Sequence, residues 1–139
     1  EIYQCDWSSD VCFSDLAKPE KTCVNFWGDA AFGHSGLDFE TCVRDRIPIL
    51  SILVNNHCMA AELNVMTGST AKYRSTDISG NYSDLAKALG GYSERITNPA
   101  EIVAAIKRGV AKTREGTPVL LEFMTKKETR SSTYGRSGG

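Results

Sequence analysis

Short apolar runs alternate along this chain with segments whose apolar residues recur at helical spacing. The runs at residues 21–27 (KTCVNFW), 49–54 (ILSILV) and 119–124 (VLLEFM) are rich in β-branched, aromatic and aliphatic residues. The first run stops at a Gly-Asp pair and the second at an Asn-Asn pair, which are typical of turns. Runs of this length, bounded by turn residues, predict three buried strands.

Helical patterns occupy the segments between and after these runs. Ser35 is followed by Asp38 at a spacing that resembles a capping box, which predicts a helix from Ser35 to Arg46. A shorter helix is expected from Ser83 to Leu89, with Ser83 as its cap. The alternation of strands and helices predicts an α/β domain with a parallel sheet flanked by helices.

The last helix is predicted to begin at Asn98-Pro99, with Asn as the cap and Pro in the first turn. Its apolar positions predict the face that packs on the sheet: Ile102, Val103, Ile106 and Val110. Residues 66–82 are rich in Gly, Ser and Thr and show neither period, so we expect a long loop there. A loop of that length in a compact domain is more often functional than not.

Composition narrows the class of protein. The chain has 139 residues, which suits one ordinary domain, and its formal net charge of −1 provides no basic surface for a nucleic acid. Its longest apolar stretch, residues 47–54, is too short to cross a bilayer. The five cysteines include no Cys-x-x-Cys pair, and their odd count favours reduced thiols in a cytoplasmic protein. We therefore expect neither a nucleic acid nor a membrane as a partner.

The first sixteen residues do not match the rest of the chain. They contain four acidic residues, no basic residue and two of the five cysteines. Residues 5–16 (CDWSSDVCFSDL) closely resemble a translated sequencing adapter, so we expect residues 1–16 to be non-native; a genuine N-terminal arm is the alternative. Without them the net charge changes from −1 to +3. We expect the functional domain at residues 17–125 and a polar, flexible tail at residues 126–139.

Two polar residues follow the first two predicted strands. Asp29 comes directly after the first strand, and Asn56 comes after the second. In a βαβ unit both strands run the same way, so these side chains face one crevice if the strands are adjacent or separated by one other strand. Carboxylate and amide oxygens suit Mg²⁺, which is often shared with phosphate groups. The crevice is therefore a candidate site for a metal and a diphosphate.

Neighbouring residues support this hypothesis. Gly28 has no side chain where a ligand would approach the backbone, and Ala30 and Ala31 keep that approach open. A sharp turn after Asn56 is expected to direct the carbonyl of Cys58 at the same ion. Each feature is weak alone, because such residues also end ordinary strands. The glycine-rich motifs of P-loop and dinucleotide sites are absent.

Together these residues resemble a known family. Gly28-Asp29-Ala30 followed by Asn55-Asn56 is similar to the Gly-Asp-Gly…Asn-Asn motif of thiamine-diphosphate-dependent enzymes. The intervening AFGHSGLDFETCVRDRIPILSILVNN resembles the acetolactate synthase, benzoylformate decarboxylase and oxalyl-CoA decarboxylase branch. The similarity continues through DISGNYSDLAKALGG and GTPVLLEF, and so covers residues 17–124.

The resemblance implies a flavodoxin-like or Rossmann-like three-layer fold, truncated on its N-terminal side, from a much larger subunit. It implies thiamine diphosphate and Mg²⁺ as cofactors, with Asp29, Asn56 and the carbonyl of Cys58 as metal ligands. The backbone of residues 28–31 would lie against the diphosphate. The second subunit of a homo-oligomer would supply the glutamate that activates the aminopyrimidine. The substrate would be a small 2-oxo acid or acyl compound, and this chain, holding half of a site and no catalytic residue, would be inactive alone.

The chain differs from the family pattern at two positions, and one alternative function is also considered. The third Gly of the motif is Ala30 here, and Cys58 occupies a position where Gly or another small residue is usual. The alternative is a stand-alone flavodoxin-like or receiver-like domain that uses Asp29 and Mg²⁺ for regulation. A receiver would place a lysine after a late strand, which Lys126 and Lys127 match only thinly.

Overall fold

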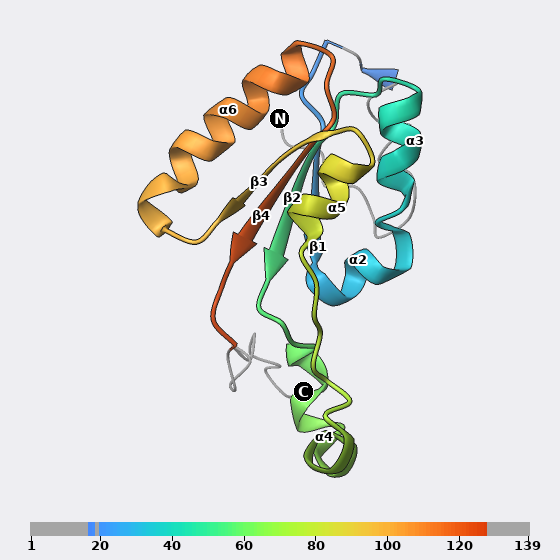
Figure 1. The fold of residues 1–139 in the computed structure, drawn as a ribbon, viewed down its shortest axis with the longest axis vertical. Coiled ribbons are helices and arrows are strands. Elements are labelled where there is room, and N and C mark those ends of the chain that lie inside the picture. The colour runs from blue at the N-terminus through green and yellow to red at the C-terminus, as the bar shows by residue number, and fades with distance from the viewer. Residues whose placement is uncertain (1–16, 19, 128–139) are drawn as a thin grey trace, which may run out of the picture.

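The computed structural model describes residues 17–18 and 20–127, and its centre is a four-stranded parallel sheet (Figure 1). The strands are β1 (Val24–Gly28), β2 (Leu50–Asn55), β3 (Tyr92–Ile96) and β4 (Val119–Met124). They lie in the order β1-β2-β4-β3, and each neighbouring pair is parallel. The predicted fold class is thus confirmed. The expected adapter-derived segment, 1–16, and most of the expected tail, 128–139, lie outside the described residues.

β2 and β4 occupy the middle of the sheet. Of their residues, Val54 alone is exposed and Met124 alone is half-buried; the others are buried. A central strand of a parallel sheet is covered on both faces, so it appears in the sequence as an almost continuous apolar run. This is why both strands could be predicted from the sequence.

Helices cover both faces of the sheet, which gives three layers (Figure 1). They are α2 (Asp29–Ser35), α3 (Asp38–Arg44), α4 (Thr67–Tyr73), α5 (Tyr82–Ala88) and α6 (Ile102–Arg114), with the 3-10 helices η1 (Ala60–Asn64) and η2 (Pro99–Glu101). On one face, α6 packs into a core that includes Leu50 and Leu121. On the other, α2, α3 and α5 pack around Leu53 and Leu120. α4 lies beyond the carboxyl ends of the strands.

The segment after β1 forms two helices, so the prediction of one helix beginning at Ser35 is wrong. α2 begins at Asp29, directly at the end of β1, and Ser35 is its last residue. The residue before α3 is Leu37, which supplies no capping side chain. The break falls at Gly36, where a Cβ atom would overlap the ring of Phe32. The spacing of Ser35 and Asp38 therefore does not mark a capping box, and the break between the helices falls at a glycine packed against the ring of Phe32.

The long loop predicted at residues 66–82 is wrong in part, because it contains α4. Arg74, directly after the last residue of this helix, takes the left-handed conformation (φ 54), and the helix contains no buried residue. A helix with no buried residue needs no apolar stripe, so the sequence offered no period to detect. The next helix is capped by Asn81, which accepts a hydrogen bond from the backbone N–H of Asp84, and not by Ser83.

β3 has no counterpart in the prediction from sequence. It is an edge strand, and its central residues, Glu94 and Arg95, make it look like a polar connection. Arg108 of α6 donates two hydrogen bonds to the carboxylate of Glu94, at 2.8 and 2.6 Å. Edge strands tolerate charged residues because one side is open to water. A partner of opposite charge on the covering helix also compensates the charge of a strand residue.

The face of α6 that packs on the sheet matches the predicted face only in part. Ile102 and Val103 are exposed, with 63% of Val103 accessible to solvent. The buried positions of the helix are Ala105, Gly109 and Thr113. A Cβ atom at Gly109 would lie 3.0 Å from the side chain of Leu50, so small residues let the helix approach the strands closely. The expected packing of Ile106 and Val110 against this core is confirmed.

The predicted cap at Asn98 is confirmed. The side chain of Asn98 accepts a hydrogen bond from the backbone N–H of Ala100 at the start of η2, which leads into α6. Cys42 and Cys58 are buried and Cys23 is half-buried, as expected for small side chains in a core. No helix within the described part of the chain is long and apolar enough to cross a bilayer.

Candidate functional site

The expected site lies where β1 and β2 end side by side. The two strands are adjacent and parallel, and Gly28 is paired with Val54 in their register. Asp29 follows β1 as the first residue of α2, and Asn56 follows the last residue of β2. The strands are therefore neighbours and not separated by a third strand, which brings both polar residues to one edge of the sheet.

The carboxylate of Asp29 joins the two strand ends. Asp29 is 4% exposed, and its Oδ1 accepts a hydrogen bond from the N–H of Ala30 at 2.9 Å. Its Oδ2 accepts one from the backbone N–H of Cys58 at 3.2 Å. The side-chain oxygen of Asn56 accepts a hydrogen bond from that same N–H at 2.8 Å. Because both oxygens bind one donor, Asp29 and Asn56 lie close together.

Residues 55–58 form a tight turn, which we call the Asn-Asn turn. The side-chain oxygen of Asn55 accepts a hydrogen bond from the N–H of His57 at 3.0 Å, so each asparagine binds the backbone two residues later. His57 takes a left-handed conformation (φ 57), uncommon for residues other than glycine. Its side chain is exposed, whereas that of Cys58 is buried.

Residues 76–78 brace the Asn-Asn turn. The N–H of Ile78 donates to the carbonyl of His57 at 3.0 Å, and the N–H of Met59 donates to the carbonyl of Thr76 at 2.8 Å. Cys58 and Asp77 form an antiparallel bridge. Part of the segment predicted as a loop therefore holds the turn in place, and this contact joins residues well separated in the sequence.

Below the turn lies a buried acid that the sequence-based search for site residues missed. Glu122 of β4 is fully buried. One of its oxygens accepts a hydrogen bond from the side-chain amide of Asn55 at 2.6 Å, and the other accepts one from the N–H of Ser83 at 3.0 Å. Arg95 of β3 lies 3.9 Å from the second oxygen. The sequence did contain a signal for Glu122, because it is an acid inside the apolar run VLLEFM. A charged side chain in a buried strand needs hydrogen-bond or charged partners, which marks it as a residue with a specific role.

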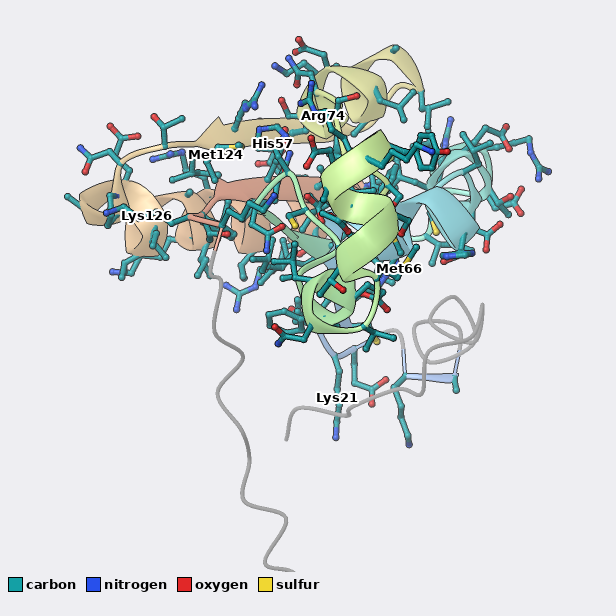
Figure 2. The ribbon with its side chains drawn as sticks, turned by 90° about the horizontal axis from the view of Figure 1, so that it is seen from below. Lys21, His57, Met66, Arg74, Met124 and Lys126 are labelled. Carbon is teal, nitrogen blue, oxygen red and sulfur yellow. The ribbon has the colours of Figure 1, made fainter. Side chains whose placement is uncertain are left out.

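Charged and aromatic groups surround this edge of the sheet. Asp77 is hydrogen bonded to Arg74 at 2.6 Å and to Lys127 at 3.4 Å, and these two cations lower the pKa of its carboxyl. Burial, and then the charges of Asp29 and Glu122, raise the pKa of Tyr82. Figure 2 looks at the carboxyl ends of the strands, with α4 in front of them and with Arg74 and His57 labelled at this end.

The backbone beside Asp29 is open. Gly28 is exposed, and a Cβ atom there would meet no other atom within 4 Å. Ala30 and Ala31 are half-buried in the first turn of α2. The helix that begins at this site is therefore α2, and not the helix expected near Ser35.

In the residues that the structure describes, no group of three or more His, Cys, Asp or Glu side chains could hold a metal ion. The donors available at this edge are instead one carboxylate, that of Asp29, together with neutral oxygens. These are the Asn56 side-chain oxygen and the carbonyl of Cys58, which accepts a hydrogen bond from the N–H of Ala60 at 2.9 Å. Such a set suits a hard divalent cation and not Zn²⁺, which prefers nitrogen and sulfur.

Comparison with known proteins matches this chain to a family model. The model, described as "Thiamine pyrophosphate enzyme, C-terminal TPP binding domain", matches residues 11–123. The chain belongs to this family. The assignment agrees with the resemblance seen at the two strand ends. It argues against the alternative of a stand-alone receiver-like domain. In the described hydrogen bonds, the partner of Lys127 is Asp77 and not Asp29, the acid that such a domain would use.

Individual members of the thiamine pyrophosphate enzyme family are similar to most of the chain. The acetolactate synthase large subunit IlvG of Mycobacterium tuberculosis is 30% identical over 112 residues, which are 79% of this chain and 20% of that protein. Human 2-hydroxyacyl-CoA lyase 1 is 27% identical over 112 residues, 73% of this chain and 19% of that protein. The chain thus spans about a fifth of the length of these relatives.

A solved structure shares the fold. It is a thiamine diphosphate-dependent 4-hydroxybenzoylformate decarboxylase from Rhodococcus jostii RHA1, with a TM-score of 0.75 and 20% sequence identity. The alignment covers 86% of this chain and 23% of the decarboxylase chain. The three-layer arrangement around a parallel sheet is therefore found in a thiamine diphosphate-dependent enzyme.

Proposed function

We propose that the edge formed by β1 and β2 binds Mg²⁺ and, through it, the diphosphate of thiamine diphosphate. The metal ligands from this chain are the side chains of Asp29 and Asn56 and the carbonyl of Cys58. The observation that carries the proposal is the convergence of the Asp29 carboxylate and the Asn56 oxygen on one N–H, at 3.2 and 2.8 Å. Family membership supports the diphosphate as the bound group.

The residues present fit this group. An ionised carboxylate offers about four lone-pair positions. The hydrogen bonds to Asp29 from Ala30 and Cys58 use two of them. The Asn56 oxygen and the Cys58 carbonyl each accept one hydrogen bond and keep one lone pair. Mg²⁺ takes about six oxygens and usually keeps several for water and phosphate, so three protein oxygens are sufficient.

Both departures from the family motif are compatible with this role. Ala30 adds a methyl group but lies in regular helix, where a residue with a side chain is unstrained. Only the backbone of Cys58 is required, and its side chain is buried. The open space beside Gly28 supports an approach of the diphosphate to the backbone of residues 28–31.

The complete enzyme is proposed to make or break a C–C bond next to a carbonyl group of a 2-oxo acid or 2-hydroxyacyl substrate, in the cytoplasm. Thiamine diphosphate supplies carbanion chemistry when bound. This chain's residues anchor its charged end: Asp29 provides the negative charge, and the Asn-Asn turn holds Asn56 and Cys58 in place. The activating glutamate would come from the second subunit of a homo-oligomer, and this chain alone would be inactive. The names of the relatives, a synthase and a lyase, support this reaction class.

Replacing Asp29 tests the proposal. In the intact subunit that carries this domain, Asp29→Ala is expected to weaken Mg²⁺-dependent binding of thiamine diphosphate by roughly 100-fold or more, because Mg²⁺ has few protein ligands to lose. Isothermal titration calorimetry of the apoenzyme, with and without Mg²⁺, measures this. Asp38→Ala is the matched control, since Asp38 is an exposed acid in the next helix, and it should bind like the wild type. Unchanged affinity in Asp29→Ala would rule out the assignment.

A further inference from the structure

Glu122 connects three segments of the chain through one buried side chain. It lies in β4, paired in register with Leu53 of β2 and Arg95 of β3. Its oxygens accept hydrogen bonds from the side chain of Asn55 and from the backbone of Ser83 in the first turn of α5. A fully buried carboxylate is costly, and these donors, with Arg95 at 3.9 Å, offset that cost.

The hydrogen bond between Glu122 and Asn55 sets the orientation of the Asn55 amide. Both oxygens of Glu122 accept hydrogen bonds, one from the N–H of Ser83 and the other from the NH₂ group of Asn55 at 2.6 Å, so that NH₂ group faces the Glu122 side chain. The carbonyl oxygen of the amide then points the other way. That oxygen accepts the N–H of His57 at 3.0 Å. Reversing the amide would place its NH₂ group against the N–H of His57, with no acceptor between them.

The orientation of Asn55 in turn affects the Asn-Asn turn. His57 is held in the left-handed conformation (φ 57), which is unfavourable for a residue with a side chain and needs support from its surroundings. The bond from its N–H to Asn55 is part of that support. The next N–H, that of Cys58, is the donor on which Asp29 and Asn56 converge. Two hydrogen bonds, from Asn55 to Glu122 and from His57 to Asn55, thus connect Glu122 to the turn that carries the proposed metal ligands.

We propose that Glu122 is a positioning residue of the cofactor site: as a buried acceptor, it fixes the Asn55 amide and thereby the turn that presents Asn56 and Cys58. Glu122 itself touches neither metal nor diphosphate. This inference rests on the proposed function. Partners that orient metal ligands in this way commonly contribute about 10- to 100-fold to metal affinity.

The first test replaces the carboxylate by an amide of the same shape. In the intact subunit, Glu122→Gln puts an NH₂ group opposite the Asn55 amide or the N–H of Ser83, so one pair of donors must face each other. We expect the affinity for thiamine diphosphate at saturating Mg²⁺ to fall roughly 10- to 100-fold. Calorimetric titration is done at a temperature where thermal unfolding shows every variant to be folded.

Glu94→Gln is the matched control. Glu94 is a strand glutamate in the neighbouring β3, with an arginine partner, but it contacts Arg108 and Tyr92 and is not linked to the Asn-Asn turn in the described hydrogen bonds. This variant is expected to lower the melting temperature and to leave cofactor affinity unchanged. A role of Glu122 in stability alone would give Glu122→Gln the same behaviour as this control.

A second test exchanges the hydrogen-bond donor and acceptor roles of positions 55 and 122. In the double variant Asn55→Asp with Glu122→Gln, the new carboxylate at position 55 accepts from the amide introduced at position 122 and from the N–H of His57, so both donors again have an acceptor. Asn55→Asp alone sets two carboxylates against each other across a contact of 2.6 Å and should bind most weakly. The double variant is expected to recover affinity to within about threefold of the wild type. Because each single variant loses affinity, this recovery would show a large coupling energy between positions 55 and 122.

The outcomes separate this inference from the proposed function. If the wild type binds without Mg²⁺, or Asp29→Ala binds normally, the proposed function fails and the role of Glu122 fails with it. If Asp29→Ala loses binding but Glu122→Gln behaves like Glu94→Gln, the role of Glu122 alone is overturned. The same holds if the double variant binds no better than Asn55→Asp. Selective loss of affinity in Glu122→Gln, restored by the exchange, supports the inference.

Discussion

At the scale of single residues, the pairing of Glu94 with Arg108 predicts a pH dependence of stability. The hydrogen bonds from Arg108, and more weakly that from Tyr92, hold the pKa of Glu94 below its usual value of 4.5, although burial opposes them. A depressed pKa in the folded state contributes stability that is present above the unfolded pKa and is lost as the pH falls through the folded pKa. Urea denaturation is therefore expected to show the wild type losing stability more steeply than Glu94→Gln between about pH 5 and pH 3. Parallel curves for the two proteins would contradict this assignment.

At the scale of elements, α5 depends on its cap. Asn81 accepts hydrogen bonds from the N–H of Asp84 at 3.1 Å and from the hydroxyl of Ser83 at 3.0 Å. Asn81→Ala is expected to lower the free energy of unfolding by about 1 kcal/mol, because an N–H at the helix start loses its acceptor. Asn81→Ser keeps a capping oxygen and should retain most of the stability in chemical denaturation. Equal losses in both variants would show that the capping oxygen is not what matters.

At the scale of the whole molecule, the two cores on opposite faces of the sheet make different residues important. Leu53 is fully buried on the face covered by α2, α3 and α5, whereas Val103 of α6 is largely exposed. Leu53→Ala is expected to cost roughly 2–5 kcal/mol, because it leaves a cavity between sheet and helices. Val103→Ala should change stability by less than about 0.5 kcal/mol. Urea denaturation of Leu53→Ala tests the core under α2, α3 and α5, and that of Val103→Ala tests whether this side of α6 is unpacked. A large loss in Val103→Ala would contradict the structure.

Local signals in the sequence were sufficient to place the central strands and the polar residues that end them. β2 and β4 are apolar along nearly their whole length, and Asp29 and Asn56 follow strands that stop at turn residues. These features depend on neighbours in the chain, so they are visible without the fold. The cap at Asn98 was predictable for the same reason.

Long-range contacts decided the rest. α4 contains no buried residue and β3 carries charges satisfied from another element, so neither has a periodic pattern. The face of α6 was set by close approach at Gly109, which no hydrophobic period reveals. The link from Glu122 through Asn55 joins strands far apart in the sequence. The sequence by itself indicated which oxygens end the strands, whereas only the tertiary structure showed that they meet at one N–H and what holds them there, because hydrogen bonds between distant segments leave no local pattern.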